Sequence, residues 1–98
     1  PIPVHGIAGD QQAALIGQEC FDVGDCKSTF GTGAFLLMNA GDTFIQSKHR
    51  MLTTIGYRVN GNTTFALEGA IFIAGALIQW LRDNMKFFSD SKESEVLA

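Results

Sequence analysis

The stretch Ser28–Gly41, "STFGTGAFLLMNAG", decides how this chain folds, because it has the pattern of a strand interrupted by glycine. Glycine has no side chain to pack and loses more backbone entropy on ordering than any other residue, so Gly31 and Gly33 weaken a strand. Two arrangements would account for this cost. Either the glycines form a tight turn between antiparallel strands, or another group approaches the backbone closely at this point.

The chain has 98 residues, which is enough for one small domain and too few for two. Only 17% of its residues are charged, whereas about 25% is typical of soluble domains. This shortage favours a surface that is partly covered by protein outside this chain, and a compact domain of unusual composition is the alternative. The opening residues, "PIPVHG", also suggest a chain cut from something larger.

Several classes of protein are not expected. The net charge is −3 without a cluster of Lys and Arg, so the sequence lacks the footprint of a nucleic-acid binder. Cys20 and Cys26 have neither zinc-site spacing nor the density of a disulfide scaffold, which favours a reduced, cytoplasmic protein without a metal site. Ala70–Leu81 is the longest apolar stretch and is shorter than the ~20 residues that span a bilayer, so no membrane segment is expected.

Local patterns predict an α/β domain with a mixed sheet, β-hairpins and flanking helices. Asn60-Gly61 between "MLTTIGYRV" and "TTFAL" is the strongest hairpin signal. Residues 89–98 are polar and form either a linker or the start of a further helix. The other expected elements are a buried strand in "PVHGIA", a helix in "QQAALIGQ", a pair of strands or one kinked strand around the two glycines, and a buried helix over Gly69–Met85.

Asp10 stands where the first strand ends and the first helix begins, the edge at which open α/β sheets bind ligands. Its carboxylate either caps the helix, by accepting the backbone N–H of Gln12 or Ala13, or is directed at a substrate hydroxyl. Because position 13 is alanine, there is no reciprocal capping box, and Gln11 is left to bind a polar ligand. The residues alone leave both roles open.

The "GTG" turn presents Thr32 between Gly31 and Gly33, where no Cβ obstructs the amides. Such a tip forms an anion-binding concavity of the kind that phosphates use, although an ordinary hairpin also uses this pattern. The sequence does not match the Walker motif.

A second candidate surface lies on the late helix. Gly75, Ile78 and Gln79 are spaced i, i+3 and i+4, so they share one helix face. That face forms either a groove with a polar edge or a surface packed against the sheet.

Four stretches carry a resemblance to a known family: "GIAGDQQAALIGQ", "KSTFGTGAFLLMNAG", "LTTIGY" and "FALEGAIFIAGALIQWLRD". Over about Ile2–Asp83 they resemble the glycerol kinases, a branch of the FGGY carbohydrate kinase family. The resembled part is the start of that family's C-terminal domain, which would occupy residues 1–88 here. The resemblance therefore implies part of the ribonuclease-H-like fold shared with actin, hexokinase and Hsp70-type ATPases.

The resemblance also implies a function, the ATP-dependent phosphorylation of glycerol to glycerol 3-phosphate. At the glycerol end, Asp10 would be the catalytic base, Gln11 would hold a neighbouring hydroxyl, and Phe35 would pack against the carbon chain. At the nucleotide end, the ATP phosphates would meet Gly31, Thr32 and Gly33, and the nucleotide site would be lined by Gly75, Ile78 and Gln79. None of the departures from the family pattern is at a proposed contact: Phe30 for Tyr, Ala40 for Thr and Ser28 for Asn.

Much of such a site would come from other segments of the kinase, including most ligands of Mg²⁺. The resemblance leaves open whether the full-length protein is a homo-oligomer. The alternatives are a non-catalytic nucleotide-binding or structural module of the same fold, and another FGGY sugar kinase. Asp10 discriminates between enzyme and module, because a binding module needs no base.

We predict that the isolated 98 residues have no kinase activity, because they hold only half of a site. The measurement is glycerol-dependent ATP turnover by the purified chain. Turnover that is present and that Asp10→Asn abolishes would contradict the prediction.

Overall fold

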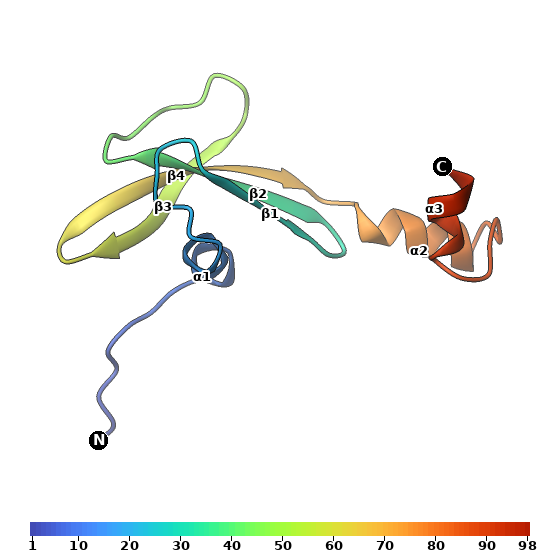
Figure 1. Cartoon of the computed structure of the whole chain (residues 1–98), viewed down its shortest axis with the longest axis horizontal. Helices are drawn as coiled ribbons and strands as arrows, with labels where there is room; N and C mark the ends of the chain where they lie inside the picture. The colour runs from blue at the N-terminus through green and yellow to red at the C-terminus, as the bar shows by residue number, and fades with distance from the viewer. The chain divides into compact units, whose positions relative to one another are not determined.

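The computed structural model describes all 98 residues. The chain forms three helices and a four-stranded sheet with the strand order β1-β2-β4-β3. These elements are labelled in Figure 1. Contacts divide the chain into two compact units, a larger one of residues 1–29 and 35–69 and a smaller one of residues 30–34 and 70–98. The elements are α1 (Asp10–Gly17), β1 (Cys26–Phe30), β2 (Ala34–Gly41), β3 (Leu52–Val59), β4 (Asn62–Ile71), α2 (Gly75–Asp83) and α3 (Glu93–Leu97).

Two hairpins build the sheet, as expected. β3 and β4 pair antiparallel from Leu52↔Glu68 to Val59↔Asn62. Asn60 and Gly61 connect them with φ angles of 51° and 83°, the left-handed values that a type I′ turn requires. The other hairpin joins β1 to β2 through Gly31–Gly33.

The sheet of this chain is antiparallel, whereas we expected a mixed sheet. Parallel neighbours need a crossover of a dozen or more residues, and the two hairpin connections are far shorter. β2 and β4 also run in opposite directions, since Gly33 before β2 lies against Ile71 at the end of β4. The α/β class itself stands, because the chain combines three helices with the sheet.

The core of the larger unit forms between α1 and the sheet. Leu15 of α1 and Leu37 of β2 are fully buried, and Ala66 of β4 lies with them. Gly56 sits at an irregularity in the β3 register, and a Cβ there would lie 3.1 Å from Leu15 Cδ2. Glycine at this position therefore lets α1 pack closely on β3.

A buried amide connects the exit of α1 to the sheet. Asn39 is 1% exposed, and its Nδ2 donates to the Cys20 carbonyl at 3.0 Å and to the Tyr57 hydroxyl at 3.3 Å. Its Oδ1 accepts the Gly41 N–H at 2.8 Å. Because these bonds satisfy the amide, its burial carries little desolvation cost.

The predicted strand "PVHGIA" is wrong. Residues 1–9 have no regular structure and are exposed, with Ile7 at 95%. A strand needs a neighbour for its backbone hydrogen bonds, and the sheet of this chain pairs no strand with this segment. An apolar run in the sequence shows that burial is favourable but does not supply that partner.

The helix expected over Gly69–Met85 is shorter than predicted and is not buried in this chain. Residues 69–71 continue β4, and α2 occupies only Gly75–Asp83 with no buried residue. Ile71 and Ile73 are β-branched and favour extended backbone, which delays the helix start. No helix here is long and apolar enough to cross a membrane.

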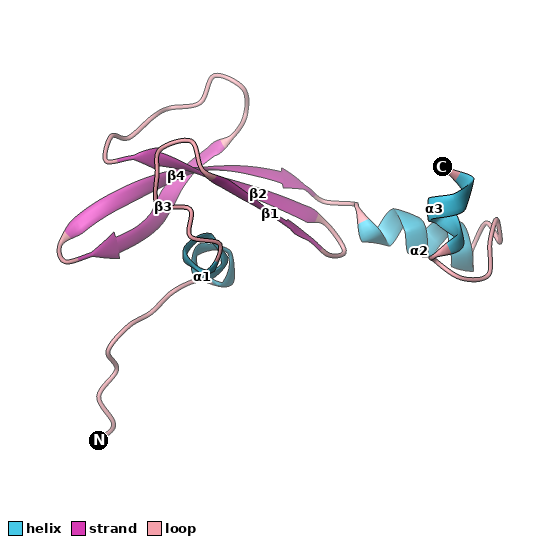
Figure 2. Ribbon diagram, in the orientation of Figure 1, coloured by secondary structure: helices cyan, strands magenta, loops and turns pink.

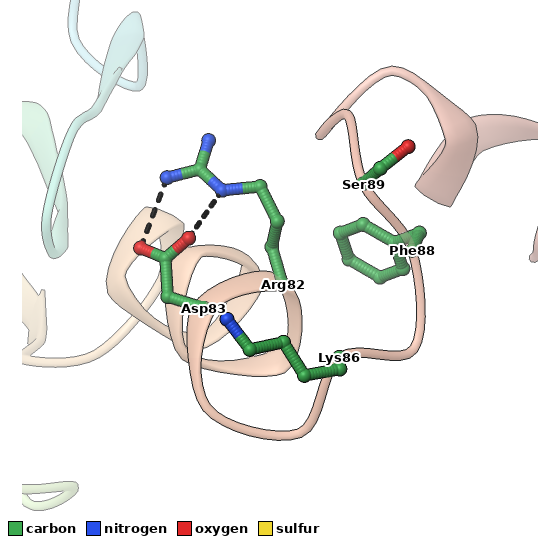
Figure 3. A pocket seen from close by; sticks show the side chains of 5 residues that line it. All are labelled: Arg82, Asp83, Lys86, Phe88 and Ser89. Carbon is green, nitrogen blue, oxygen red and sulfur yellow. Dashed lines mark hydrogen bonds and ion pairs between the residues drawn. The ribbon is translucent and has the colours of Figure 1, made fainter.

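The smaller unit is helix and loop from residue 72 onward (Figure 2). At the end of α2, Arg82 Nε and Nη2 donate to the two Asp83 carboxylate oxygens at 2.6 and 3.0 Å (Figure 3). This hydrogen bonding lowers the pKa of Asp83. Arg82 Nη1 also donates to Ser91 Oγ at 3.0 Å, which connects α2 to the segment before α3.

We predict that the two free cysteines react at very different rates. Cys20 is 4% exposed and its burial raises the pKa of the thiol, whereas Cys26 is exposed. Since the thiolate is the reactive form, a thiol reagent at pH 8 should modify Cys26 at least about tenfold faster than Cys20. The measurement is the time course of labelling followed by mass spectrometry, with Cys26→Ser as the control that loses the fast phase. Equal rates in the folded protein would contradict the structure.

Candidate functional site

Asp10 is the first residue of α1, and Gly9 occupies the N-cap position. The Asp10 carboxylate accepts the N–H of Gln11 at 2.8 Å through Oδ1. The capping role that we considered, with Gln12 or Ala13 as donor, is wrong, because Asp10 lies one residue past the cap and the Gly9 carbonyl accepts the Ala13 N–H. The side chain is exposed, so its other oxygen is free to meet a ligand.

Gln11 is half-buried and is bonded through one end of its amide. Its Oε1 accepts a hydrogen bond from Lys27 Nζ on β1. The Nε2 group makes no hydrogen bond within the chain and remains able to donate. We therefore expect Gln11 to bind a polar ligand as a donor, through its NH₂ group.

Lys27 is a residue that sequence reasoning missed. It is 5% exposed, and its Nζ also donates to Thr29 Oγ1 at 2.9 Å. Burial lowers the pKa of Lys27, and the charges of Asp10 and Glu68 oppose that shift. The signal in the sequence was the spacing of Lys27 and Thr29, two positions apart on a strand, which places both side chains on one face.

These side chains form a polar group on the larger unit, composed of Asp10, Gln11, Lys27 and Thr29. It offers a carboxylate as proton acceptor next to an amide that donates, with an ammonium behind the amide. Such a set can bind a compound with adjacent hydroxyl groups. Phe35 is half-buried on β2.

The smaller unit brings the "GTG" turn and the start of α2 together. The Gly31 carbonyl accepts the Gly75 N–H at 2.9 Å. The Thr32 carbonyl accepts the N–H groups of Ala74 and Ala76 at 2.8 and 3.2 Å. The turn therefore satisfies the first amides of α2, which has no side-chain cap.

Both explanations of the glycines hold at once. The turn is a hairpin, and it is also a site of close backbone approach. A Cβ on Gly33 would lie 2.6 Å from the Ile71 carbonyl oxygen, and one on Gly75 would lie 2.5 Å from the Gly31 oxygen. Neither Gly31 nor Gly33 has a left-handed φ, so the requirement is for space.

The anion-binding concavity expected at the turn has fewer free backbone N–H groups than predicted. The Gly31 N–H donates to the Gly33 carbonyl at 2.7 Å and does not face outward as a free donor. Thr32 is exposed at the tip, and its N–H and hydroxyl have no protein partner. The donors for an anion are therefore centred on Thr32.

The predicted face of α2 is open in this chain. Gly75 and Gln79 are exposed and Ile78 is half-buried. Among the described residues there is no group of three or more His, Cys, Asp or Glu side chains that could hold a metal ion.

Comparison with known proteins identifies what the chain is similar to, although no family model matches it. It is 64% identical over 97 residues to glycerol kinase from Marinomonas sp., covering 99% of this chain. It is 57% identical over 98 residues to glycerol kinase from Rhodospirillum rubrum. In each case it spans 20% of the relative's length, so its sequence corresponds throughout to one segment of the glycerol kinases.

A solved structure agrees with the sequence relatives. The crystal structure of Plasmodium falciparum glycerol kinase with ADP matches 94% of this chain with a TM-score of 0.84 at 46% identity, over 18% of that protein. The match confirms the expected fold class, part of the actin- and hexokinase-like ATPase fold.

We predict that alanine at position 33 destabilises the protein and that alanine at position 31 does not. A Cβ added at position 33 would collide with the backbone of Ile71, whereas a Cβ added at position 31 would meet no atom closer than 3.9 Å. Gly33→Ala should lower the free energy of unfolding by about 1–3 kcal/mol. Gly31→Ala, the matched control, should change it by less than about 0.5 kcal/mol. The measurement is urea unfolding of the purified protein, and equal effects of the two variants would contradict the contact.

Proposed function

We propose that this chain, which corresponds to one segment of the glycerol kinases, carries the catalytic base and part of the nucleotide site of an ATP-dependent glycerol kinase. The reaction is the phosphorylation of glycerol to glycerol 3-phosphate. The observation that carries the proposal is the 57–64% identity to glycerol kinases over 97 or 98 of the 98 residues. The exposed Asp10 carboxylate beside the Gln11 amide supports it with suitable chemistry.

At the glycerol end, Asp10 accepts the proton of the attacking hydroxyl. The hydroxyl oxygen then bonds to the γ-phosphorus of ATP while the bond from that phosphorus to the bridging oxygen breaks, which releases ADP. Phosphoryl transfer passes through a loose transition state, so the protein mainly positions the groups and stabilises charge. Gln11 holds a neighbouring hydroxyl through its NH₂ group, and Phe35 packs against the carbon chain.

At the nucleotide end, Thr32 offers its N–H and hydroxyl to the phosphates, with Gly31 and Gly33 removing side chains from the approach. The open face of α2, with Gly75, Ile78 and Gln79, lies along the nucleotide. The turn and α2 are held together by their own backbone hydrogen bonds, which makes them one preformed surface. The relative from Plasmodium falciparum was solved with ADP, which supports a nucleotide ligand.

The proposal assigns Asp10 to the glycerol end of the reaction and Thr32 to the nucleotide end. This chain has no group of three or more His, Cys, Asp or Glu side chains that could hold a metal ion, and we assign most ligands of Mg²⁺ to other segments of the kinase. We also place the protein in the cytoplasm, where ATP and glycerol are present and where two free cysteines stay reduced.

Two other functions are less well supported. A non-catalytic nucleotide-binding module of the same fold has no use for the exposed Asp10 carboxylate. Another FGGY sugar kinase is disfavoured by the identity to glycerol kinases along the whole chain.

A segment exchange tests the proposal. This chain replaces the corresponding segment of the Marinomonas sp. kinase, and the chimera is assayed for glycerol phosphorylation with a coupled ADP assay. We expect activity, and we expect Asp10→Asn to lower kcat by about 10²–10⁴-fold because the base is lost.

The matched control is Asp22→Asn, which removes another exposed carboxylate of the larger unit. It should leave kcat unchanged. A folded chimera without activity on glycerol would contradict the proposal, and so would equal activity of the Asp10→Asn and Asp22→Asn variants.

A further inference from the structure

Lys27 is a buried cation without an ion pair. It is 5% exposed, and the chain's single ion pair within 4.0 Å joins Arg82 to Asp83. Removing an ammonium from water is costly unless its protons find acceptors. Lys27 finds two, Gln11 Oε1 on α1 and Thr29 Oγ1 on its own strand.

The bond to Gln11 determines which way that amide faces. A glutamine amide has an acceptor end and a donor end, and on its own it can present either to a ligand. The ammonium of Lys27 carries three donors and no acceptor, so it can bind only the oxygen. With Oε1 held by Lys27, the Nε2 group is the end that remains for a ligand.

We infer that Lys27 is a positioning residue that fixes Gln11 as a hydrogen-bond donor and thereby selects substrates with an acceptor oxygen beside the reacting hydroxyl. The inference rests on the proposed function for its substrate, glycerol. Lys27 itself touches no reacting atom. Its effect is on the recognition of the neighbouring hydroxyl.

The test measures discrimination between glycerol and its deoxy analogues, propane-1,2-diol and propane-1,3-diol, in the chimera with the Marinomonas sp. kinase. Propane-1,3-diol lacks the hydroxyl beside the reacting one, which is the hydroxyl that Gln11 binds. The chimera should therefore have a higher kcat/KM for glycerol than for propane-1,3-diol. In Lys27→Met the amide is free to turn, and this preference should fall about tenfold, mainly through a higher KM for glycerol. A purely structural role would lower kcat/KM for glycerol and for both diols by the same factor.

Three further variants make the test specific. Lys27→Gln, which can present either a donor or an acceptor to Gln11, should relax the preference as Lys27→Met does. Thr29→Val removes the other acceptor of Lys27 and should keep the preference. Lys48→Met, at an exposed lysine, should leave all constants unchanged.

A double-mutant cycle isolates the pair. If Lys27 acts through Gln11, the Gln11→Ala/Lys27→Met double variant should be no worse on glycerol than Gln11→Ala alone, within about twofold. If the losses of the two single variants multiplied in the double variant, the inference would be overturned. An unchanged glycerol preference in a folded Lys27→Met or Lys27→Gln variant would also overturn it. An unsubstituted chimera that does not phosphorylate glycerol would refute the proposed function. An active chimera whose Lys27 variants keep the normal preference for glycerol would refute only the role of Lys27.

Discussion

The arrangement of the smaller unit depends on two places where backbone meets backbone without room for a Cβ. Gly33 lies against the Ile71 carbonyl, and Gly75 lies against the Gly31 carbonyl. These contacts allow the turn carbonyls to accept the first amides of α2, so the hairpin tip and the helix start form one surface. The entropic cost of glycine in a strand is offset by the hydrogen bonds that the close approach permits.

The larger unit uses a different device to position its polar groups. Gly9 caps α1, which leaves Asp10 in the first turn with an exposed carboxylate, and the packing of Leu15 on Gly56 holds the helix against β3. Lys27 then holds the oxygen end of the Gln11 amide. A carboxylate and an oriented donor result, the pair that we propose for the phosphorylation of glycerol.

The sequence predicted features that depend on local chemistry and failed on those that depend on distant partners. The Asn60-Gly61 hairpin follows from backbone freedom, whereas the close approach at Gly31–Gly33 follows from the absence of a Cβ, and in both cases a single residue type decides the feature. The strand in "PVHGIA" and the buried helix over Gly69–Met85 were wrong because burial needs a neighbouring surface, which no local pattern supplies. Lys27 was missed because a lysine in a strand normally faces water, whereas here it is buried with Gln11 of α1 as a partner.

The central claim is that Asp10 and the tip at Thr32 serve one reaction. The most direct measurement is a crystal structure of the active chimera with ADP and glycerol bound. We expect a glycerol hydroxyl within hydrogen-bond distance of the Asp10 carboxylate and the terminal phosphate of ADP beside Thr32. Glycerol bound away from Asp10, or Thr32 on a surface that the nucleotide does not reach, would contradict it.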